Sequence, residues 1–373
     1  MPGSQTPRAV ETHSVRRRQR WLAGVLRALA RVELWFDRVS WGLRKRFGRL
    51  GPLQIVAYRS YGTRSELTVR GRVLEASVLE RSLPNDSRWR SFRRMLRRFV
   101  SHEVPEVAVR AALGESVATG QTDDEGYFDL PISPSSSSAG VGSWQSAELE
   151  LTSCPVRGLA SARATAEVRV LGPDVELGVI SDIDDTILQT HVTQKLKMIW
   201  VTLSGSAFTR MPFEGTTELY RALEAGASGH ADNPVFYVSK SPWNLYDFLI
   251  DFMDHHALPR GPLLLRDIGL REAPPLDHKS DAVRRLLEVY PQLPFVLIGD
   301  SGERDPDIYL ETAQRYPGRI RAIYIRDLGG KSATAESRRS LTEAAARIGV
   351  EMLWMEHAQV ALAHARERGF VRD

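Results

Sequence analysis

The chain has 373 residues, of which 42% are hydrophobic and 26% charged, with 50 Lys+Arg against 46 Asp+Glu. At roughly 150 residues per domain, this length predicts two or three domains, and the composition excludes a wholly disordered, collagen-like or coiled-coil chain. Cys154 is the single cysteine, which excludes an intrachain disulfide, an all-cysteine zinc site and an iron–sulfur cluster, and is typical of a reducing compartment.

Positive charge is concentrated in two blocks, although the net charge of the whole chain is only +4. Residues 1–50 hold 12 Lys+Arg against 3 Asp+Glu, and residues 81–101 hold 7 against 1. Local basic blocks of this kind indicate an anionic partner, either a nucleic acid or a membrane surface.

The first block contains a segment that resembles an export signal but lacks its uninterrupted apolar stretch. Within 14–36, Arg27 and Arg31 break the apolar run, and no small-residue cleavage site follows. Apolar residues recur instead at three- and four-residue spacing, which predicts that 1–50 is a basic segment with an amphipathic helix. No stretch reaches the ~18 apolar residues of a membrane span. The helix either lies in the headgroup region of a membrane or docks on the protein's own core.

A second basic amphipathic helix is predicted at 85–101, as an insertion in the domain that follows. Trp89, Phe92 and Leu96 share one helical face, and arginines surround that face. The basic face is either simply solvated, or the segments 14–49 and 85–101 both bind one anionic membrane surface.

Residues 51–172 are predicted to form a small antiparallel β-sandwich domain. Apolar and polar residues alternate, or β-branched residues are frequent, in five segments of this region: 53–62, 66–75, 106–113, 143–152 and 164–171. Segment 119–132 predicts two strands joined by a turn at Asp123–Gly126. Turns spaced in this way are typical of antiparallel sandwiches.

Residues 173–373 alternate apolar strands with helices. The expected strands are 175–187, 233–241, 261–268, 295–305, 320–328 and 349–355, and the expected helices are 213–226, 243–256, 278–291, 305–317 and 357–370. This order predicts an α/β domain with a parallel sheet and helices on both of its faces. Ligands bind at the carboxyl ends of the strands in such sheets, so the candidates are the polar residues just after strands: Asp182, Asp184, Ser239 and Asp300.

Two aspartates follow the first of these strands directly and suit phosphoryl transfer. Asp182 can act as a nucleophile that forms an acyl phosphate, and Asp184, on the same side of an extended backbone, can act as general acid and base. Clustered carboxylates need a cation, which predicts Mg2+ held by Asp182, Asp184 and Asp300. Asp305 is either a further ligand of that ion or a cap of the helix that follows it.

Phosphate-binding groups are expected around the same point. Ser239 can hydrogen-bond phosphoryl oxygens, and Lys279 can keep Asp182 ionised and neutralise charge in the transition state. Lys240 is a rival phosphate ligand beside Ser239. Thr186, which ends the motif that begins at Asp182, is predicted to bind phosphate as well.

The motifs resemble the four motifs of haloacid dehalogenase (HAD) superfamily phosphatases, namely DIDDT at 182–186, Ser239, Lys279 and GDSGERD at 299–305. More narrowly, the strings DIDDTI, YVSKSPWNLYDFL, DHK and IGDSGERDPDIY resemble the catalytic domain of actin-patch-protein-type phosphatidate phosphatases, over roughly 175–330. The resemblance implies a HAD-like Rossmannoid sheet within a catalytic domain at 173–373. It also implies Mg2+-dependent hydrolysis of phosphatidic acid to diacylglycerol.

The resemblance assigns roles residue by residue. It gives Asp182 the nucleophile role, Asp184 the acid/base role, and Ser239 and Lys279 the phosphate-binding roles. The metal roles fall to Asp300 and Asp182, together with the backbone carbonyl of Asp184.

These residues are compatible with three functions. The chain is a peripheral-membrane phosphatidate phosphatase, a HAD phosphatase acting on a soluble phosphoester or phosphoprotein, or a non-catalytic scaffold that binds anionic lipid. The intact aspartates argue against the scaffold, and the phosphatase motifs favour lipid over nucleic acid as the anionic partner. We expect a flap over the site at 190–215. The expected location is cytoplasmic, or peripheral on the cytoplasmic face of the membrane.

Overall fold

The computed structural model of the chain describes residues 51–75, 104–135, 143–153, 162–184, 186–187, 213–266, 278–329 and 334–372. The basic segments predicted at 14–49 and 85–101, and residues 190–212 of the expected flap, lie outside the described residues. Within the described ranges, no helix is long and apolar enough to cross a membrane.

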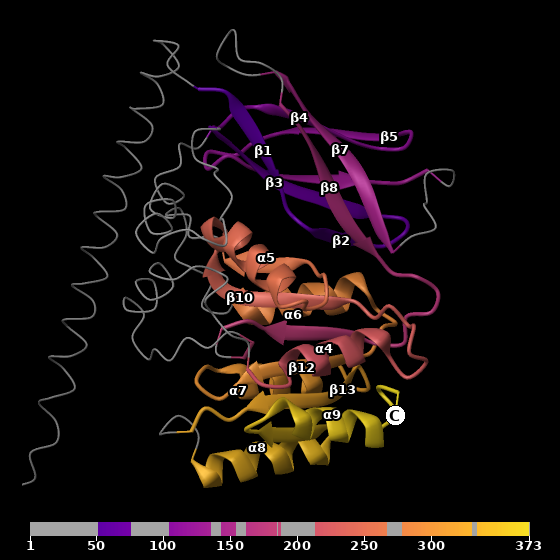
Figure 1. Cartoon of the computed structure of the whole chain (residues 1–373), viewed down its shortest axis with the longest axis vertical. Helices are drawn as coiled ribbons and strands as arrows, with labels where there is room; N and C mark the ends of the chain where they lie inside the picture. The colour runs from indigo at the N-terminus through magenta and orange to yellow at the C-terminus, as the bar shows by residue number, and fades with distance from the viewer. Residues whose placement is uncertain are drawn as a thin grey trace, which may run out of the picture. The chain divides into compact units, whose positions relative to one another are not determined.

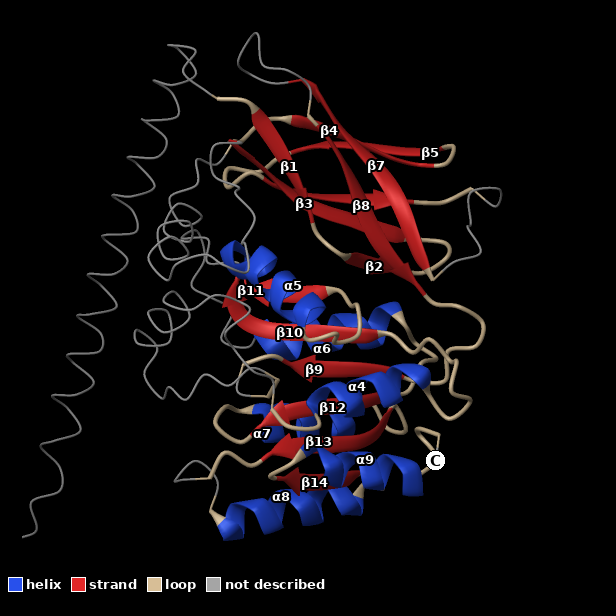
Figure 2. Cartoon of the chain, in the orientation of Figure 1, coloured by secondary structure: helices blue, strands red, loops and turns tan. Residues whose placement is uncertain are grey.

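The first part of the described chain forms an eight-stranded sheet that is almost wholly antiparallel (Figures 1 and 2). Its strands are β1 (Leu53–Ala57), β2 (Ser60–Gly62), β3 (Leu67–Glu75), β4 (Ala108–Leu113), β5 (Ser116–Gln121), β6 (Tyr127–Ile132), β7 (Trp144–Ser153) and β8 (Arg163–Val170). They pair in the order β1-β3-β2-β8-β7-β4-β5, and β6 pairs with β3. Among the described strands of this sheet, only β2 and β8 pair in parallel. The predicted antiparallel sheet is confirmed, and its arrangement as a sandwich stays a prediction.

Local chemistry explains two boundaries in this sheet. The predicted turn lies between β5 and β6, where Asp123 Oδ1 accepts hydrogen bonds from the backbone N–H of Glu125 and Tyr127, both at 2.9 Å. Gly126 adopts a φ of 80° there, which favours glycine. The single strand predicted at 53–62 is wrong in one respect, because it divides into β1 and β2 around Tyr58, whose ring is buried against Trp243.

The second part contains a six-stranded sheet in which every pair is parallel. Its strands are β9 (Gly178–Asp182), β10 (Val235–Pro242), β11 (Leu263–Arg266), β12 (Phe295–Asp300), β13 (Ile320–Arg326) and β14 (Glu351–Met355). The spatial order is β11-β10-β9-β12-β13-β14. The chain runs outward from β9 to β11 and then returns to the other side of β9, so the order reverses between β9 and β12. A parallel sheet binds ligands at the carboxyl ends of its strands beside such a reversal.

Helices cover both faces of the parallel sheet (Figure 2). They are α4 (Thr216–Ala225), the short 3-10 helix η3 (Trp243–Leu245), α5 (Tyr246–His255), α6 (His278–Val289), α7 (Asp305–Arg315), α8 (Ala335–Arg347) and α9 (Ala358–Glu367). Neighbouring strand residues point to opposite faces, so Val179 packs in the core under α4, α5 and α9, and Ile180 in the core under α6, α7 and α8. The predicted mixed α/β fold, with a parallel sheet and its helices, is confirmed.

Helix α8 was not among the predicted elements. Ala345 is its only buried residue, and Leu341 and Ala344 on the same face are only partly buried. A local signal was nevertheless present, because the Thr334 side chain caps the helix by accepting a hydrogen bond from the Ser337 N–H at 3.1 Å.

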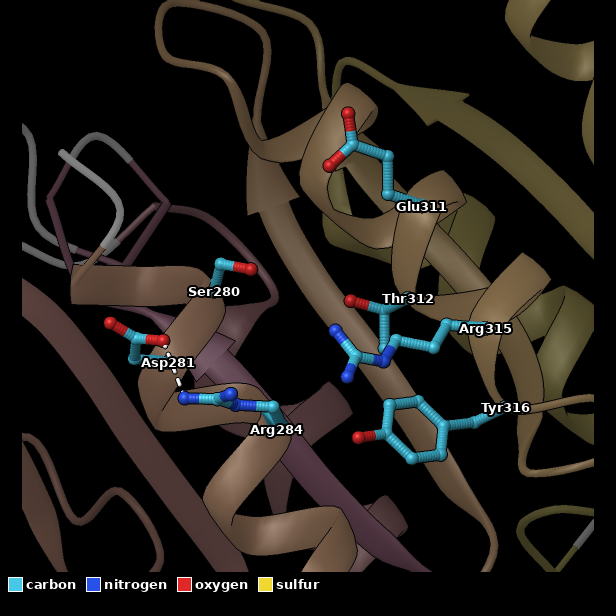
Figure 3. Close-up of a pocket in the computed structure, with 7 residues that line it drawn as sticks. All are labelled: Ser280, Asp281, Arg284, Glu311, Thr312, Arg315 and Tyr316. Atoms are coloured by element: carbon cyan, nitrogen blue, oxygen red, sulfur yellow. Dashed lines mark hydrogen bonds and ion pairs between the residues drawn. The ribbon is translucent and has the colours of Figure 1, made fainter.

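A polar cleft of about 130 Å3 lies between α6 and α7 (Figure 3). Seven residues line it: Ser280, Asp281, Arg284, Glu311, Thr312, Arg315 and Tyr316. Asp281 and Arg284 form an ion pair at 2.8 Å across one turn of α6. None of the predicted site residues lines this cleft.

Helix α6 is expected to depend on Leu286, which is fully buried in the core under α6, α7 and α8. Leu286→Ala should lower the free energy of unfolding by about 2–5 kcal/mol, because it removes buried methyl groups and leaves a cavity. Urea denaturation measures this change. Val360→Ala on α9 is the control, since Val360 is 47% exposed and should change stability by less than about 0.5 kcal/mol. Equal effects of the two substitutions would contradict this packing.

Candidate active site

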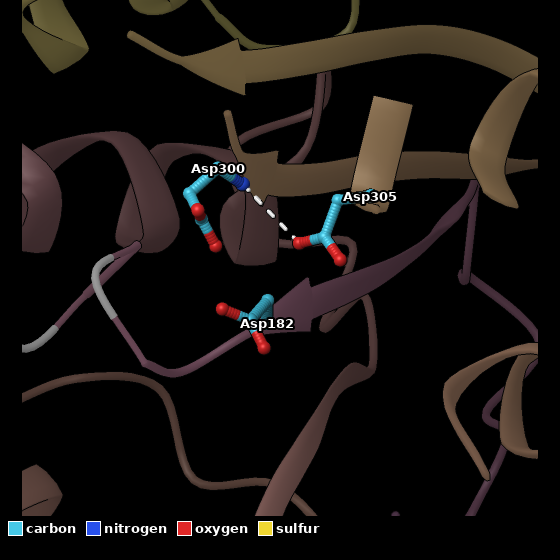
Figure 4. Close-up of side chains that lie close together, drawn as sticks. All are labelled: Asp182, Asp300 and Asp305. Atoms are coloured by element: carbon cyan, nitrogen blue, oxygen red, sulfur yellow. Dashed lines mark hydrogen bonds between the residues drawn. The ribbon is translucent and has the colours of Figure 1, made fainter. Parts of the chain in front are cut away.

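Three buried aspartates meet at the carboxyl edge of the parallel sheet (Figure 4). Asp182 ends β9, Asp300 ends the neighbouring strand β12, and Asp305 begins α7 directly after it. Parallel pairing of Ile298 with Ser181 brings the two strand ends together. One oxygen from each of the three carboxylates lies within 4.8 Å of the others, and each aspartate is at most 1% exposed.

Lys279 supplies a buried positive charge to this cluster from the start of α6. Its Nζ lies 2.8 Å from Asp182 Oδ1 and also pairs with Asp305 Oδ1. Burial alone would lower the pKa of Lys279, but the carboxylates of Asp182 and Asp305 outweigh burial and raise that pKa well above its ordinary value. Lys279 is therefore charged at the position where the sequence predicts a partner for Asp182.

The three carboxylates are also buried, and protein groups compensate only a minor part of their negative charge. Burial raises the pKa of Asp182 and of Asp305, and the attraction of Lys279 opposes that rise at both residues. Burial and the neighbouring Asp305 raise the pKa of Asp300 to about 7. A cluster of this kind is stable in its ionised form only with a further cation.

The donor set and its geometry fit a hard divalent cation. Asp300 Oδ1 accepts hydrogen bonds from the N–H groups of Gly302 and Glu303, at 2.6 and 3.1 Å. Asp300 Oδ2 is buried and has no hydrogen-bond partner among the described residues. A carboxylate held on one oxygen and unpartnered on the other, beside two further carboxylates, suits Mg2+, which prefers oxygen ligands.

Asp305 does not cap α7, so the capping alternative is wrong. Its Oδ2 accepts a hydrogen bond from the backbone N–H of Asp300 at 3.2 Å, and its Oδ1 accepts one from Lys279. The N-cap position belongs to Arg304, which makes no side-chain cap hydrogen bond. Gly299 permits this approach, because a Cβ at that position would lie 2.8 Å from Asp305 Cβ.

The second aspartate of the motif is held by two serines. Asp184 Oδ2 accepts a hydrogen bond from Ser239 Oγ at 2.7 Å and a longer one from Ser241 Oγ at 3.2 Å. Ser239 Oγ in turn accepts the N–H of Ser241 at 2.8 Å. Burial raises the pKa of Asp184, while the bond from Ser239 opposes that rise. A carboxyl group with a raised pKa at this position can hold and release a proton.

The remaining predicted residues also lie at this edge. Thr186 Oγ1 donates to Asp182 Oδ2 at 3.1 Å, so it orients the carboxylate instead of pointing away from it. Lys240, 41% exposed in its side chain, lies 2.8 Å from the carboxylate of Glu303. Glu303 also contacts Lys279 at 3.1 Å. The structure therefore brings all the predicted site residues into one region.

Two residues of this site were not predicted. Ser241 lies two positions after Ser239, on the same side of β10, and Glu303 lies inside the GDSGERD motif between two predicted ligands. Alternation along β10 was the available signal for Ser241. The sequence gives no such signal for Glu303, because the turn from 301 to 304 has no regular periodicity. Lys279 and Lys240 outweigh the effect of burial and lower the pKa of Glu303.

The carboxylate cluster predicts that stabilisation by Mg2+ depends on pH. In the metal-free protein, the raised pKa of Asp300, about 7 against about 3.9 when unfolded, favours proton binding by the folded state. Stability of the metal-free protein should therefore fall as pH rises from about 4 to 7, and stay low above that. Mg2+ bound to the ionised cluster should restore it, so the Tm increase caused by Mg2+ should be larger at pH 8 than at pH 5.5.

Differential scanning calorimetry in Mg2+ and in EDTA measures this increase, at ~2–4 °C for each kcal/mol of binding free energy. Asp300→Asn is the control and should lose the Mg2+ effect at both pH values. A Tm increase of equal size at pH 5.5 and pH 8 in the unsubstituted protein would contradict the assignment.

Residues 177–327, which contain every predicted site residue, match the family model described as phosphatidate phosphatase APP1, catalytic domain. The chain is 32% identical over 155 residues to phosphatidate phosphatase APP1 of Saccharomyces cerevisiae, covering 40% of this chain and 26% of that protein. It is 30% identical over 157 residues to an uncharacterized protein of Schizosaccharomyces pombe, covering 41% and 25%. The chain thus spans about a quarter of the length of these curated relatives.

Among solved structures, a bacterial immunoglobulin-like domain from the M. primoryensis ice-binding adhesin matches 32% of this chain and 96% of its own, at 10% identity and a TM-score of 0.17. That score is too low to inform the fold. The family model covers strands β9 to β13 of the parallel sheet and the carboxyl edge that holds the aspartates. Residues 177–327 accordingly match the phosphatidate phosphatase APP1 catalytic-domain family in sequence.

Proposed function

We propose that this chain is a Mg2+-dependent phosphatase that hydrolyses phosphatidic acid to diacylglycerol and phosphate at a membrane surface, within the HAD superfamily. The observation that carries the proposal is that the two aspartates have different partners. Asp182 forms an ion pair with a buried ammonium group, and Asp184 accepts hydrogen bonds from two hydroxyl groups. Two carboxyl groups in such different surroundings suit the division of one reaction between a nucleophile and an acid/base.

Asp182 has the environment of a nucleophile. Lys279 holds one of its oxygens and Thr186 the other, so the carboxylate is fixed in orientation. Attack of a carboxylate oxygen on phosphorus forms an aspartyl-phosphate and breaks the bond between phosphorus and the diacylglycerol oxygen. Lys279 remains beside the transferred group and offsets its negative charge.

Asp184 has the environment of the acid/base. Its raised pKa lets it hold a proton, which it gives to the departing diacylglycerol oxygen. The ionised Asp184 then takes a proton from water, whose oxygen attacks phosphorus, releases inorganic phosphate and regenerates Asp182. Mg2+ held by Asp182, Asp300, Asp305 and the Asp184 backbone carbonyl would supply charge neutralisation for the phosphoryl oxygens.

Substitution of the nucleophile tests the reaction. Asp182→Asn should lower turnover of phosphatidic acid in mixed micelles with Mg2+ by on the order of 10^3-fold or more, since no acyl phosphate can form. Release of inorganic phosphate is the measurement, and p-nitrophenyl phosphate is assayed in parallel. Asp307→Asn is the matched control, because Asp307 is exposed on the same helix as Asp305 and should keep full activity.

The outcomes separate the candidate functions. Turnover of the soluble ester without turnover of the lipid would replace the proposal with a phosphatase of soluble phosphoesters or phosphoproteins. No turnover of either substrate, together with binding to anionic lipid, would favour a non-catalytic scaffold.

We further propose that the basic segments 14–49 and 85–101 hold the catalytic site against an anionic membrane on its cytoplasmic face. Support comes from the sequence, whose residue spacing in each segment predicts an apolar helical face surrounded by arginines. Each Lys or Arg near such a surface contributes about 1 kcal/mol. Replacing Arg93, Arg94 and Arg97 with Gln should therefore weaken binding to anionic vesicles by up to ~100-fold at low salt.

Sedimentation with vesicles of phosphatidylserine and phosphatidylcholine measures this binding. The control replaces Arg321, Arg339 and Arg347 with Gln, because these three arginines are exposed on the catalytic domain and change the net charge equally. Equal loss of binding in both variants would show a general charge effect, and unchanged binding in the first would contradict the membrane role.

A further inference from the structure

Glu303 lies between two lysine ammonium groups at the opening of the site. Its Oε2 is 3.1 Å from Nζ of Lys279 and 2.8 Å from Nζ of Lys240. Side-chain exposure rises along this row, from 1% at Lys279 to 32% at Glu303 and 41% at Lys240. The carboxylate therefore connects the buried cation of the catalytic centre to a cation at the solvent-facing rim.

The backbone around Glu303 fixes this position. Its N–H donates to Asp300 Oδ1 at 3.1 Å, which ties the turn after β12 to the end of that strand. Lys240 directly follows Ser239 in β10, whose hydroxyl holds Asp184. Glu303 follows β12 and Lys240 lies in β10, so the segments that hold predicted catalytic groups also carry both partners of the ion pair.

The charge of the site gives this pair a consequence for phosphate. Lys279 and Lys240 are two cations at this edge, and the Glu303 carboxylate already contacts both. A phosphate group that approaches the opening carries negative charge and needs the same ammonium groups. It must compete with a carboxylate that is attached to the chain and so has a high effective concentration.

We propose that Glu303 is a specificity-determining residue that acts as a displaceable internal anion on Lys240 and Lys279. Phosphate binds only after the carboxylate leaves the lysines, so its apparent affinity is reduced by the fraction of protein in the open arrangement. This inference rests on the proposed phosphatase function for the identity of the anion.

The displacement favours substrates that contribute binding energy away from the phosphate. A small soluble phosphoester bears the whole cost of opening the ion pair, whereas a substrate with further contacts can offset it. The same cost weakens the binding of free inorganic phosphate and so promotes its release after the reaction.

Glu303→Gln tests the displacement, because the amide preserves the size and the carbonyl oxygen of the side chain but removes its charge. Isothermal titration calorimetry of the full chain in Mg2+ at pH 8 gives the dissociation constants of two probes, inorganic phosphate, a dianion, and dimethyl phosphate, a monoanion. Both should bind about 10-fold or more tightly, by the same factor, since each ligand must open the same ion pair. A residue with only a structural role would not increase affinity when substituted.

Other results would overturn the inference. If Glu303 stays in place as a fixed charge, the dianion gains more affinity than the monoanion, because repulsion scales with ligand charge. Unchanged affinity for both probes would show that the carboxylate does not compete. Glu311→Gln is the matched control, since Glu311 is exposed in the cleft of Figure 3, outside the site. An equal gain in that variant would assign the effect to net charge.

The binding measurement is independent of lipid turnover, so the two proposals can fail separately. Tighter phosphate binding in Glu303→Gln without activity on phosphatidic acid would keep the displacement and reject the lipid substrate. Activity on phosphatidic acid with unchanged phosphate affinity in Glu303→Gln would keep the lipid substrate and reject the displacement.

Discussion

The burial of Lys279 among carboxylates is the interaction on which the rest of the site depends. An ammonium at 1% exposure is costly unless it is paired, and the carboxylates beside it are costly for the same reason. Each sign of charge makes the burial of the other tolerable, so removal of either would leave an uncompensated buried charge. One lysine does not balance three buried aspartates, and among the described residues Asp300 Oδ2 has no hydrogen-bond partner, so the cluster suits a further cation.

The strand order of the parallel sheet determines where these charged groups lie. Because β9 lies between β10 and β12, the ends of three consecutive neighbours in space bring Asp182, Ser239 and Asp300 to one edge. The helices after the strands then supply what the strand ends lack, with Lys279 at the start of α6 and Asp305 at the start of α7. The candidate site therefore combines groups that are far apart in sequence but fixed by strands that are buried on both faces.

The sequence predicted those parts of the site that follow regular elements. Asp182 and Asp300 could be found because each ends an apolar strand, and Ser239 because it follows the apolar residues of β10. Most of the helices were found from the spacing of their apolar residues. Helix α8 buries only Ala345 and was missed, and Glu303 lies in an irregular turn whose contacts are set by tertiary structure. The alternative in which Asp305 caps α7 is wrong, because its carboxylate accepts hydrogen bonds from the Asp300 N–H and from Lys279.

Contacts beyond the matched family range bear on the site through the segment that follows β10. Tyr58, between β1 and β2, stacks on Trp243 with ring centroids 4.4 Å apart, and the Arg59 N–H donates to the Tyr246 hydroxyl at 2.7 Å. Trp243 and Tyr246 follow Ser239 and Ser241 in the chain, and the hydroxyls of these two serines hold Asp184. The segment between β1 and β2 thus packs against the chain that follows the two serines, so part of the support for the candidate site lies outside residues 177–327.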